Sequence, residues 1–330
     1  MTRPLFLILV ALLTFLGGQP VAAETVRIWD RASHCAFTDL VRWQDSFYCT
    51  FRESDSHVHG EDGKIRVIRS VDGQTWESTA LIARPGIDLR DPKVSVTPEG
   101  DLMLLMGGSN YEAKELVDRH PFVAFLKPGA DAFTDLQPII VDDRIASDND
   151  WLWRVTWHQG TGYGFIYQGD QTLWGLHLVK TTDGIRYTLV TSPGLPDKPN
   201  EATIRFTPQG EMRAVVRNEG GDQNGHFGRA TAPFTEWDWT PINARLGGPD
   251  LLRLPDGSWL LGTRDYRPGG PRVVLGPLSA EGTFVPATKL PSGGDCSYPG
   301  MLVHDGDLWV SYYSGHEDGT TSIYLYRSPL

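Results

Sequence analysis

The chain alternates short hydrophobic stretches with turn signals, and six of these turns join two hydrophobic stretches in the manner of a β-hairpin. Counted on residues 45, 99, 159, 209, 256 and 306, the turns are 54, 60, 50, 47 and 50 residues apart. A repeat of about 50 residues built from strands predicts a β-propeller, and six hairpins predict six blades. The six turns are Gln44–Ser46, Pro98–Gly100, Gln159–Thr161, Pro208–Gly210, Pro255–Gly257 and His304–Gly306.

One of these hairpins, Asn200–Arg217, carries polar side chains at its open end. Folding the segment about Gln209 places Glu201 opposite Arg217. The two residues form either a plain ion pair or part of an active site, and the other hairpins decide between these readings.

A second type of turn follows the hairpins and has the pattern Ser/Thr-x-Asp-Gly-x-x-aromatic. It occurs at Ser70–Trp76 and Thr181–Tyr187, with a degraded copy at Ser279–Phe284. In this pattern Asp caps the turn backbone and Gly takes a positive φ, so we expect Asp72 and Asp183 to have structural roles.

The last repeat lacks its outer strand, and the segment Thr25–Ala32 is suited to supply it. Closing the ring in this way leaves no open sheet edge. The sequence therefore predicts an all-β fold for residues 24–330, a six-bladed propeller of four-stranded antiparallel blades closed by the N-terminal strand. We also expect a short helix within the insertion Asn110–His120.

Residues 1–23 have the features of a secretory signal peptide: Arg3, the hydrophobic run Leu5–Leu16 and the small residues Val21–Ala23 before the cleavage position. A membrane anchor is the weaker reading because the run is short for a bilayer. We therefore expect a secreted or periplasmic protein with no membrane span after cleavage. Export permits one disulfide, and pairing of Cys35 with Cys49 or with Cys296 is open at this point.

The composition narrows the classes of partner. With 41 acidic and 30 basic residues the chain has a formal net charge of −11, which disfavours nucleic acid. The 11 Trp and 11 Tyr suit a protein that packs aromatic rings on sugars. The cysteine and histidine spacing predicts no metal site and no cofactor.

In a propeller the start of each inner strand and the end of the next strand lie on the same face of the disc. Several arginines on one face are costly without an anion, and guanidinium groups suit a carboxylate. The residues expected on this face are Arg52, Arg90, Arg154, Arg217, Arg264, Asp55, Asp91, Glu201, Asp250, His34, His57, Tyr298, Tyr312 and Tyr313.

These segments carry a resemblance to bacterial sialidases. The Asp-Gly turns resemble sialidase Asp boxes in a form one residue shorter, and Asn200–Arg217 is similar to the sialidase hairpin with the catalytic Glu and a carboxylate-binding Arg. Ser297–Tyr313 resembles the segment with the nucleophilic Tyr, Phe47–Ser54 resembles the first-blade segment, and Gly262–Tyr266 is a looser match. The likeness covers nearly all of residues 24–330 in blade order.

The resemblance implies a retaining exo-glycosidase for sialic acid or a related acidic sugar, with a sialoglycan or other acidic oligosaccharide as partner. It makes Tyr298 the nucleophile and Glu201 its base. It places the carboxylate-binding arginines at Arg52, Arg217 and Arg264, and the acid/base residue in the loop that contains Asp55, His57 and Asp62.

The chain departs from the sialidase pattern in the first blade. The sialidase Arg-Ile-Pro motif is absent, and the corresponding place begins with His34. Arg90 and Arg154, from the next two blades, are candidates for the missing contact. Two alternatives therefore stay open: a glycosidase or lyase for another sugar, and a non-catalytic sugar-binding propeller. The distance between Glu201 and the Tyr298 hydroxyl separates the second alternative from catalysis.

Overall fold

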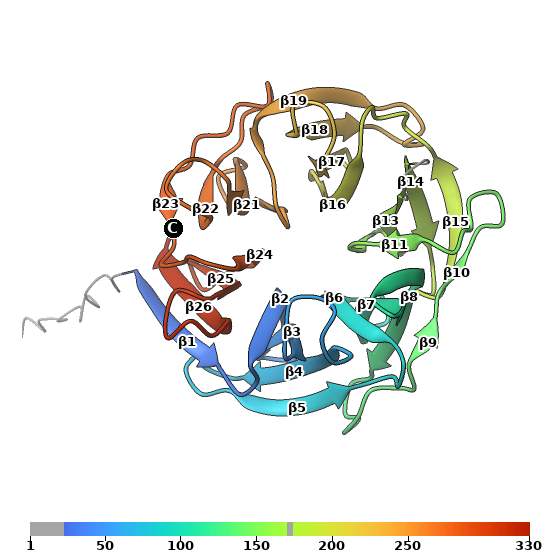
Figure 1. The fold of residues 1–330 in the computed structure, drawn as a ribbon. Helices are drawn as coiled ribbons and strands as arrows, with labels where there is room; N and C mark the ends of the chain where they lie inside the picture. The colour runs from blue at the N-terminus through green and yellow to red at the C-terminus, as the bar shows by residue number, and fades with distance from the viewer. Residues whose placement is uncertain (1–22, 170–173) are drawn as a thin grey trace, which may run out of the picture.

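A computed structural model describes residues 23–169 and 174–330. The predicted signal peptide lies outside these residues except for Ala23. In the described residues the strands form six blades around a central axis, as predicted (Figure 1). The strands are β1 (Glu24–Trp29), β2 (His34–Trp43), β3 (Ser46–Ser54), β4 (Lys64–Ser70), β5 (Glu77–Ile82), β6 (Asp88–Val96), β7 (Leu102–Glu112), β8 (Glu115–Leu126), β9 (Gln137–Pro138), β10 (Ile140–Val141), β11 (Asp150–Leu152), β12 (Thr156–His158), β13 (Thr161–Gly169), β14 (Trp174–Thr181), β15 (Arg186–Thr191), β16 (Pro199–Phe206), β17 (Met212–Asn218), β18 (Asn224–Ala230), β19 (Asp238–Arg245), β20 (Asp250–Arg253), β21 (Trp259–Asp265), β22 (Arg272–Pro277), β23 (Thr288–Lys289), β24 (Cys296–His304), β25 (Asp307–Ser314) and β26 (Ser322–Pro329).

The N-terminal strand closes the ring. β1 pairs with β26 and completes a sheet in the order β1-β26-β25-β24, which confirms the predicted closure (Figure 1). Five of the blades are four-stranded antiparallel sheets. The third differs because its inner strand is split into β11 and β12, and because β10 adds a short parallel pairing to β15.

The Asp-Gly turns have the expected structure. The Asp72 carboxylate accepts hydrogen bonds from the backbone N–H groups of Gln74 at 2.8 Å and Thr75 at 2.9 Å. Asp183 makes the equivalent bonds in the third blade, and Gly73 and Gly184 adopt φ values of 76° and 72°. These turns stabilise blade edges, as the pattern predicted.

The prediction of a helix within residues 110–120 is wrong. Strands β7 and β8 extend through this segment and pair as far as Glu112 and Glu115. Ala113 and Lys114 form the turn between them with φ values of 49° and 72°. A two-residue turn with both φ positive usually contains Gly or Asn, so the sequence lacked the ordinary signal for this hairpin.

All three cysteines lie in the described part of the chain, and each is a buried free thiol. Neither of the two disulfide pairings left open by the sequence is therefore formed. Within the same residues there is no helix with the length and hydrophobicity needed to cross a bilayer.

Four of the inner strands have a bulge close to their first residues. The pairing register shifts between Ala36 and Asp39 in β2, and β6, β16 and β24 shift at the equivalent place. At the bulge Phe37, Asp91 and Tyr298 adopt the left-handed conformation, with φ values of 65°, 52° and 53°. A bulge re-aims a side chain, and non-glycine residues hold this conformation mainly where the surrounding structure requires it.

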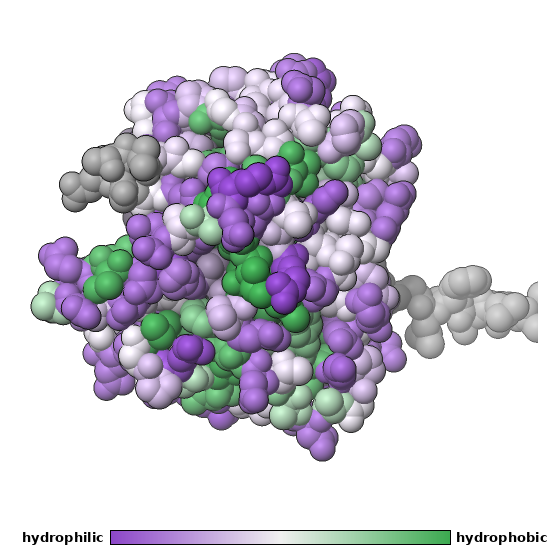
Figure 2. Space-filling view, turned by 90° about the vertical axis from the view of Figure 1, so that its right-hand side faces the viewer, coloured by the Kyte–Doolittle hydropathy of each residue, from purple (hydrophilic) through white to green (hydrophobic). Residues whose placement is uncertain are grey.

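The outer surface is mixed in character. Seen from the side that carries β10 and β15, hydrophobic residues form separate patches between hydrophilic ones (Figure 2). We call the face of the disc on which the inner strands begin the strand-start face. It carries Asp91, Glu201 and Tyr298, and the candidate site is described there.

Candidate active site on the strand-start face

A tyrosine–glutamate pair stands at the centre of the site. The Tyr298 hydroxyl donates a hydrogen bond of 2.5 Å to Oε1 of Glu201. The two residues belong to different blades and are 97 positions apart in the chain. Both side chains are buried. The other carboxylate oxygen, Oε2, accepts bonds of 2.8 Å from Arg217 and from the backbone N–H of Gly248. Every oxygen of the pair therefore has a partner, and the geometry of both side chains is fixed.

Gly248 is required at this place for a steric reason. Its φ is 56°, and a Cβ atom there would lie 2.8 Å from the Tyr298 ring. A larger residue would displace either the ring or the N–H group that binds Glu201.

The surroundings shift the pKa values of Glu201 and Tyr298 in opposite directions. Burial favours the neutral form of Glu201, but the charge and the hydrogen bond of Arg217 outweigh it, and the pKa of Glu201 lies below its ordinary value. Burial and then the negative charge of Glu201 raise the pKa of Tyr298 well above its ordinary value. At neutral pH the site holds a neutral phenol beside an ionised carboxylate, which is the arrangement of a nucleophile with its base.

Two arginines flank the pair. Arg217 forms an ion pair with Glu201 at 2.8 Å, although the ladder register shifts between Pro199 and Ala202, and its Nε donates to Glu219 at 2.6 Å. Arg264 donates to the hydroxyl of Tyr266 at 2.7 Å, and in the described residues no carboxylate pairs with it. Its guanidinium therefore keeps an uncompensated positive charge close to Tyr298 and Tyr313.

Arg52 and Arg90 share one carboxylate partner. Arg52 is fully buried and donates to Asp88 Oδ1 at 2.8 Å, while Arg90 lies 3.0 Å from Asp88 Oδ2. Each also binds a backbone carbonyl of the loop after β3, Arg52 that of Ser56 at 2.7 Å and Arg90 that of His57 at 2.8 Å. The two arginines thus hold this loop in place.

The loop after β3 brings one of its three candidate residues to the site. Asp55 accepts the N–H of Glu61 at 2.8 Å, and Asp62 accepts the N–H of Gly86 at 2.9 Å, so both carboxylates serve the loop and its neighbour. His57 instead lies edge-on to Phe37, with 5.0 Å between ring centroids, and Phe37 lies edge-on to Tyr298 at 5.1 Å.

Asp91 is the carboxylate whose importance the sequence understated. The sequence placed Asp91 on this face without giving it a role, and in the structure it is buried and none of the described residues donates a hydrogen bond to it. Burial raises its pKa to about 6, although Arg90 and Lys93 act in the opposite direction. Its negative charge also contributes to the raised pKa of Tyr298, after burial and the charge of Glu201.

Lys93 lies beneath the pair. Its Nζ is 4.3 Å from the Trp153 ring centroid and 5.3 Å from that of Tyr298. Burial lowers the pKa of Lys93 to about 8. The ammonium group lies close to both aromatic rings. Its positive charge favours any negative charge that develops on the Tyr298 oxygen.

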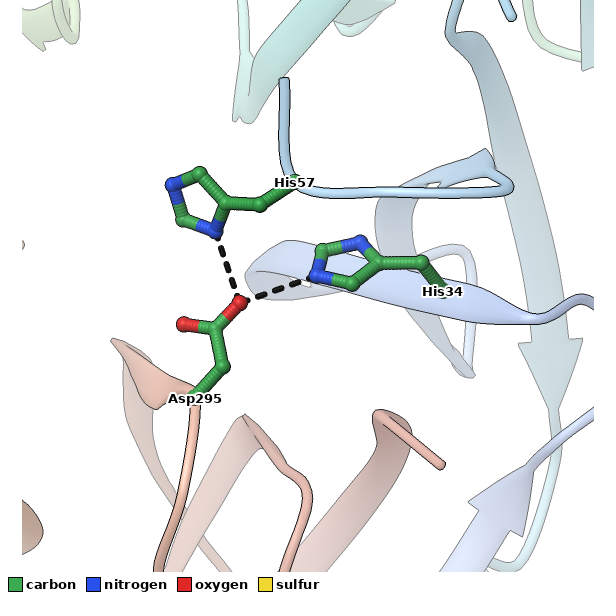
Figure 3. A group of neighbouring side chains, drawn as sticks. All are labelled: His34, His57 and Asp295. Atoms are coloured by element: carbon green, nitrogen blue, oxygen red, sulfur yellow. Dashed lines mark hydrogen bonds and ion pairs between the residues drawn. The ribbon is translucent and has the colours of Figure 1, made fainter. Parts of the chain in front are cut away.

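His34 and His57 meet a third residue that the sequence did not single out. Figure 3 shows both imidazoles directed at the carboxylate of Asp295, at 2.9 Å from His34 Nε2 and 2.7 Å from His57 Nδ1. Burial alone would raise the pKa of Asp295, but these two hydrogen bonds hold it well below its usual range. Asp295 directly precedes β24. Its position at the start of an inner strand was the only feature of the sequence that pointed to a role in the site.

Arg154 is not brought to this site. Its Nη1 binds Asp39 at 2.9 and 3.1 Å, and its Nη2 lies 3.9 Å from Asp250, which also binds Arg205 at 2.6 Å. We call Asp39, Arg154, Arg205 and Asp250 the axial ion network. Arg154 and Arg205 line a cavity of about 370 Å³ formed by later residues of the inner strands, away from the strand-start face.

Comparison with known proteins finds the same fold among solved structures. No protein-family model matches the sequence, and no curated protein sequence matches it. Among solved structures, a protein of unknown function from Dyadobacter fermentans is 19% identical with a TM-score of 0.81, and the match covers 95% of this chain and 99% of that one.

Two glycosidases share the fold at lower identity. A Trypanosoma rangeli sialidase bound to sialic acid is 11% identical with a TM-score of 0.68, over 92% of this chain and 58% of its own. An α-L-arabinofuranosidase from Fusarium graminearum bound to an iminosugar inhibitor is 13% identical with a TM-score of 0.67, over 94% and 98%. This chain therefore spans little more than half of the sialidase. The protein is a six-bladed β-propeller with a fold shared by sialidases and an arabinofuranosidase.

Proposed function

We propose that the protein is a retaining exo-glycosidase that hydrolyses terminal sialic acid or a related acidic sugar. The observation that carries the proposal is the 2.5 Å hydrogen bond between the buried Tyr298 hydroxyl and Glu201. A wide separation of these groups would have favoured a non-catalytic sugar-binding propeller. The fold shared with sialidases and the uncompensated charge of Arg264 support the same conclusion.

The first step is attack of the Tyr298 oxygen on the anomeric carbon. As the new C–O bond forms, the phenolic proton passes to Glu201 and the bond to the leaving oxygen breaks. A neutral phenol suits this reaction because an anionic carboxylate nucleophile would be repelled by a carboxylate on the same sugar carbon. Lys93 and Arg217 stabilise the negative charge as it passes from Glu201 to the Tyr298 oxygen during the attack.

The leaving oxygen needs a proton, and Asp91 supplies it in this proposal. Its pKa of about 6 leaves it protonated in mildly acidic solution. Asp55 and Asp62 are engaged within the loop and its neighbour, so they fit the role less well. In the second step the Asp91 carboxylate takes a proton from water, the water attacks the anomeric carbon, and Tyr298 leaves and recovers its proton from Glu201. Two displacements retain the anomeric configuration.

The sugar carboxylate would be bound by Arg217 and Arg264. Arg264 has free donors, and a guanidinium can bind a carboxylate through two parallel hydrogen bonds. Arg52 and Arg90 contribute indirectly in this account, since they hold the loop that carries His57.

Aryl glycosides of sialic acid, uronic acids and arabinofuranose test the proposal. We expect the wild type to hydrolyse an acidic substrate and Tyr298→Phe to lose at least about 1,000-fold in kcat, within the range known for catalytic groups. Tyr187→Phe is the matched control, because the Tyr187 hydroxyl is buried but receives no hydrogen-bond partner from the described residues. An absence of hydrolysis of every acidic substrate by the wild type would refute the proposal.

A second candidate is a glycosidase for a neutral sugar. Asp295 favours this candidate, because its carboxylate lies on the face where the sugar would bind and would repel an acidic sugar. The fold shared with the arabinofuranosidase also favours it. Hydrolysis of the arabinofuranoside, lost in Tyr298→Phe, would support this candidate over the first.

Export of the protein to the periplasm or outside the cell is part of the proposal and rests on residues 1–23. Expression of the full-length chain in a bacterial host tests it. We expect the exported form to begin at Glu24, which N-terminal sequencing would reveal.

A further inference from the structure

Two imidazoles and one carboxylate converge on the strand-start face from three separate elements. His34 is the first residue of β2, His57 lies in the loop after β3, and Asp295 directly precedes β24. Their nitrogen and oxygen atoms all lie within 4.8 Å of one another. Figure 3 shows the two rings on one side of the carboxylate and both directed at the same oxygen, Oδ2.

Each of the three residues is held in position by the surrounding structure. The carbonyl of His57 accepts a hydrogen bond from Arg90 at 2.8 Å, and the carbonyl of Asp295 accepts the N–H of Gly315 at 3.0 Å. The other carboxylate oxygen, Oδ1, accepts the hydroxyl of Tyr313 at 3.2 Å, which orients the carboxylate. The Asp295 carboxylate is therefore oriented before any ligand arrives, and a hydrogen bond of this kind to a ligating side chain is typical of metal sites.

The set of donors matches a transition-metal site. Two imidazole nitrogens and one carboxylate oxygen are the ligands of many Zn²⁺ sites in which a further coordination position is open. The bond lengths of about 2.0–2.2 Å required for Zn²⁺ would be reached by a small outward movement of the three groups. His57 has the freedom for this movement, because 47% of its side chain is exposed, and it leaves a path from solvent.

From this arrangement we infer that His34, His57 and Asp295 form a binding site for one divalent transition-metal ion of the Zn²⁺ type. His34 contributes Nε2, His57 contributes Nδ1 and Asp295 contributes Oδ2. The remaining coordination position faces solvent on the strand-start face.

The site would change the charge of this part of the face. With neutral imidazoles the three residues carry one negative charge, and a divalent ion converts this to one positive charge. Tyr313 connects the cluster to the surroundings of Arg264, since it binds Asp295 and interacts electrostatically with Arg264. If the proposed function holds, the ion supplies a third positive group for the sugar carboxylate, at the place where His34 stands instead of an arginine.

Calorimetric titration of the chelator-treated protein with Zn²⁺ tests the site. We expect one ion per chain, and a loss of at least about tenfold in affinity in His57→Ala and in Asp295→Asn. His120→Ala is the matched control, because His120 also lies near a carboxylate, 3.6 Å from Asp118, but belongs to no group of three possible ligands in the described part of the chain. Co²⁺ added to the wild type should give the visible absorption of a nitrogen- and oxygen-ligated ion, and His57→Ala should abolish it.

Two results would overturn the inference. One is the absence of stoichiometric Zn²⁺ binding by the wild type. The other is equal binding by His57→Ala, Asp295→Asn and the control, with circular dichroism showing that all are folded. The test needs no turnover, so Zn²⁺ binding without hydrolysis would refute only the proposed function, whereas Tyr298-dependent hydrolysis without Zn²⁺ binding would refute only the metal site.

Discussion

Two groups of arginines lie near the central axis, and they differ in how their charge is neutralised. In the axial ion network, Arg154 and Arg205 face Asp39 and Asp250, so that two positive and two negative groups balance. On the strand-start face Arg264 has only a tyrosine hydroxyl as a polar side-chain partner in the described residues. The comparison teaches that the number of arginines near a propeller axis does not identify a binding site, because carboxylates can neutralise them.

Asp39 and Asp250 show why the axial network is structural. Asp39 also accepts the backbone N–H of Val94, and Asp250 accepts that of Met301, each on a neighbouring blade. The two carboxylates thus connect blades through backbone bonds, and Arg154 connects the two carboxylates. On the strand-start face the contacts of Glu201 instead converge on one hydroxyl that is suited to react.

The largest effect expected from this comparison is on stability. Arg154→Ala would leave Asp39 buried without its guanidinium partner, and removal of one member of a buried pair costs about 3–5 kcal/mol. Denaturant unfolding would measure this loss. Arg144→Ala is the control, because Arg144 is exposed and its ion pair in the described residues is with Asp142 at the surface, so its loss should change stability little. A variant of Arg154 with wild-type stability would show that the axial network is dispensable.

A smaller effect, on substrate binding, is expected for Arg264→Ala. Loss of a charged hydrogen bond to the substrate, worth about 1.5–3 kcal/mol, should raise KM about 10- to 100-fold. The free energy of unfolding should change less than in Arg154→Ala, because no buried carboxylate loses its partner. Steady-state kinetics on the acidic aryl glycoside would measure this. A KM within twofold of the wild type would exclude Arg264 from substrate binding.

The pH dependence separates Asp91 from Glu201. Activity requires ionised Glu201, so it should be lost as the pH falls through a pKa below the ordinary carboxyl value. It also requires protonated Asp91, so it should be lost as the pH rises through about 6. In Asp91→Asn the decrease in activity near pH 6 should be absent from the pH profile. A wild-type limb near pH 6 that persists in Asp91→Asn would assign the proton donor elsewhere.

Asp91 should also affect stability, in a pH-dependent manner. Its pKa is about 6 in the folded protein against an ordinary value of 3.8, so the folded state binds the extra proton between these values. Stability from this group is present below pH 3.8 and is lost as the pH rises through 6. Asp91→Asn should therefore be more stable than the wild type at pH 8, as melting temperatures would reveal.

The sequence was sufficient to predict the six hairpins and the ring closure, because turn residues mark each hairpin and the spacing repeats. The facing of Glu201 and Arg217 followed from hairpin register, and the observed pairing keeps that register from Ala202 to Phe206. The meeting of Glu201 with Tyr298 depended on the resemblance to sialidases, since nothing local relates residues 97 positions apart.

The sequence could not predict the direction of side chains near the bulges. In a strand a shift of one residue turns a side chain to the other face, and the inner strands are irregular where their polar residues occur. Arg154 lies between β11 and β12 and is directed to the axial network, whereas Asp91 is buried at the bulge of β6 and has a φ of 52°. The meeting of Asp295 with His34 and His57 joins residues 261 and 238 positions apart, so spacing rules for metal ligands could not find it.

The most direct test of the central claim is to trap the bond that Tyr298 is proposed to form. The wild type is incubated with 2,3-difluorosialic acid, from which a nucleophile displaces fluoride at the anomeric carbon, and the digested protein is mapped by mass spectrometry. The account predicts one added sugar on the peptide that contains Tyr298, and none in Tyr298→Phe. A sugar attached to any other residue, or hydrolysis of sialosides with no trapped sugar and with inversion at the anomeric carbon, would contradict it.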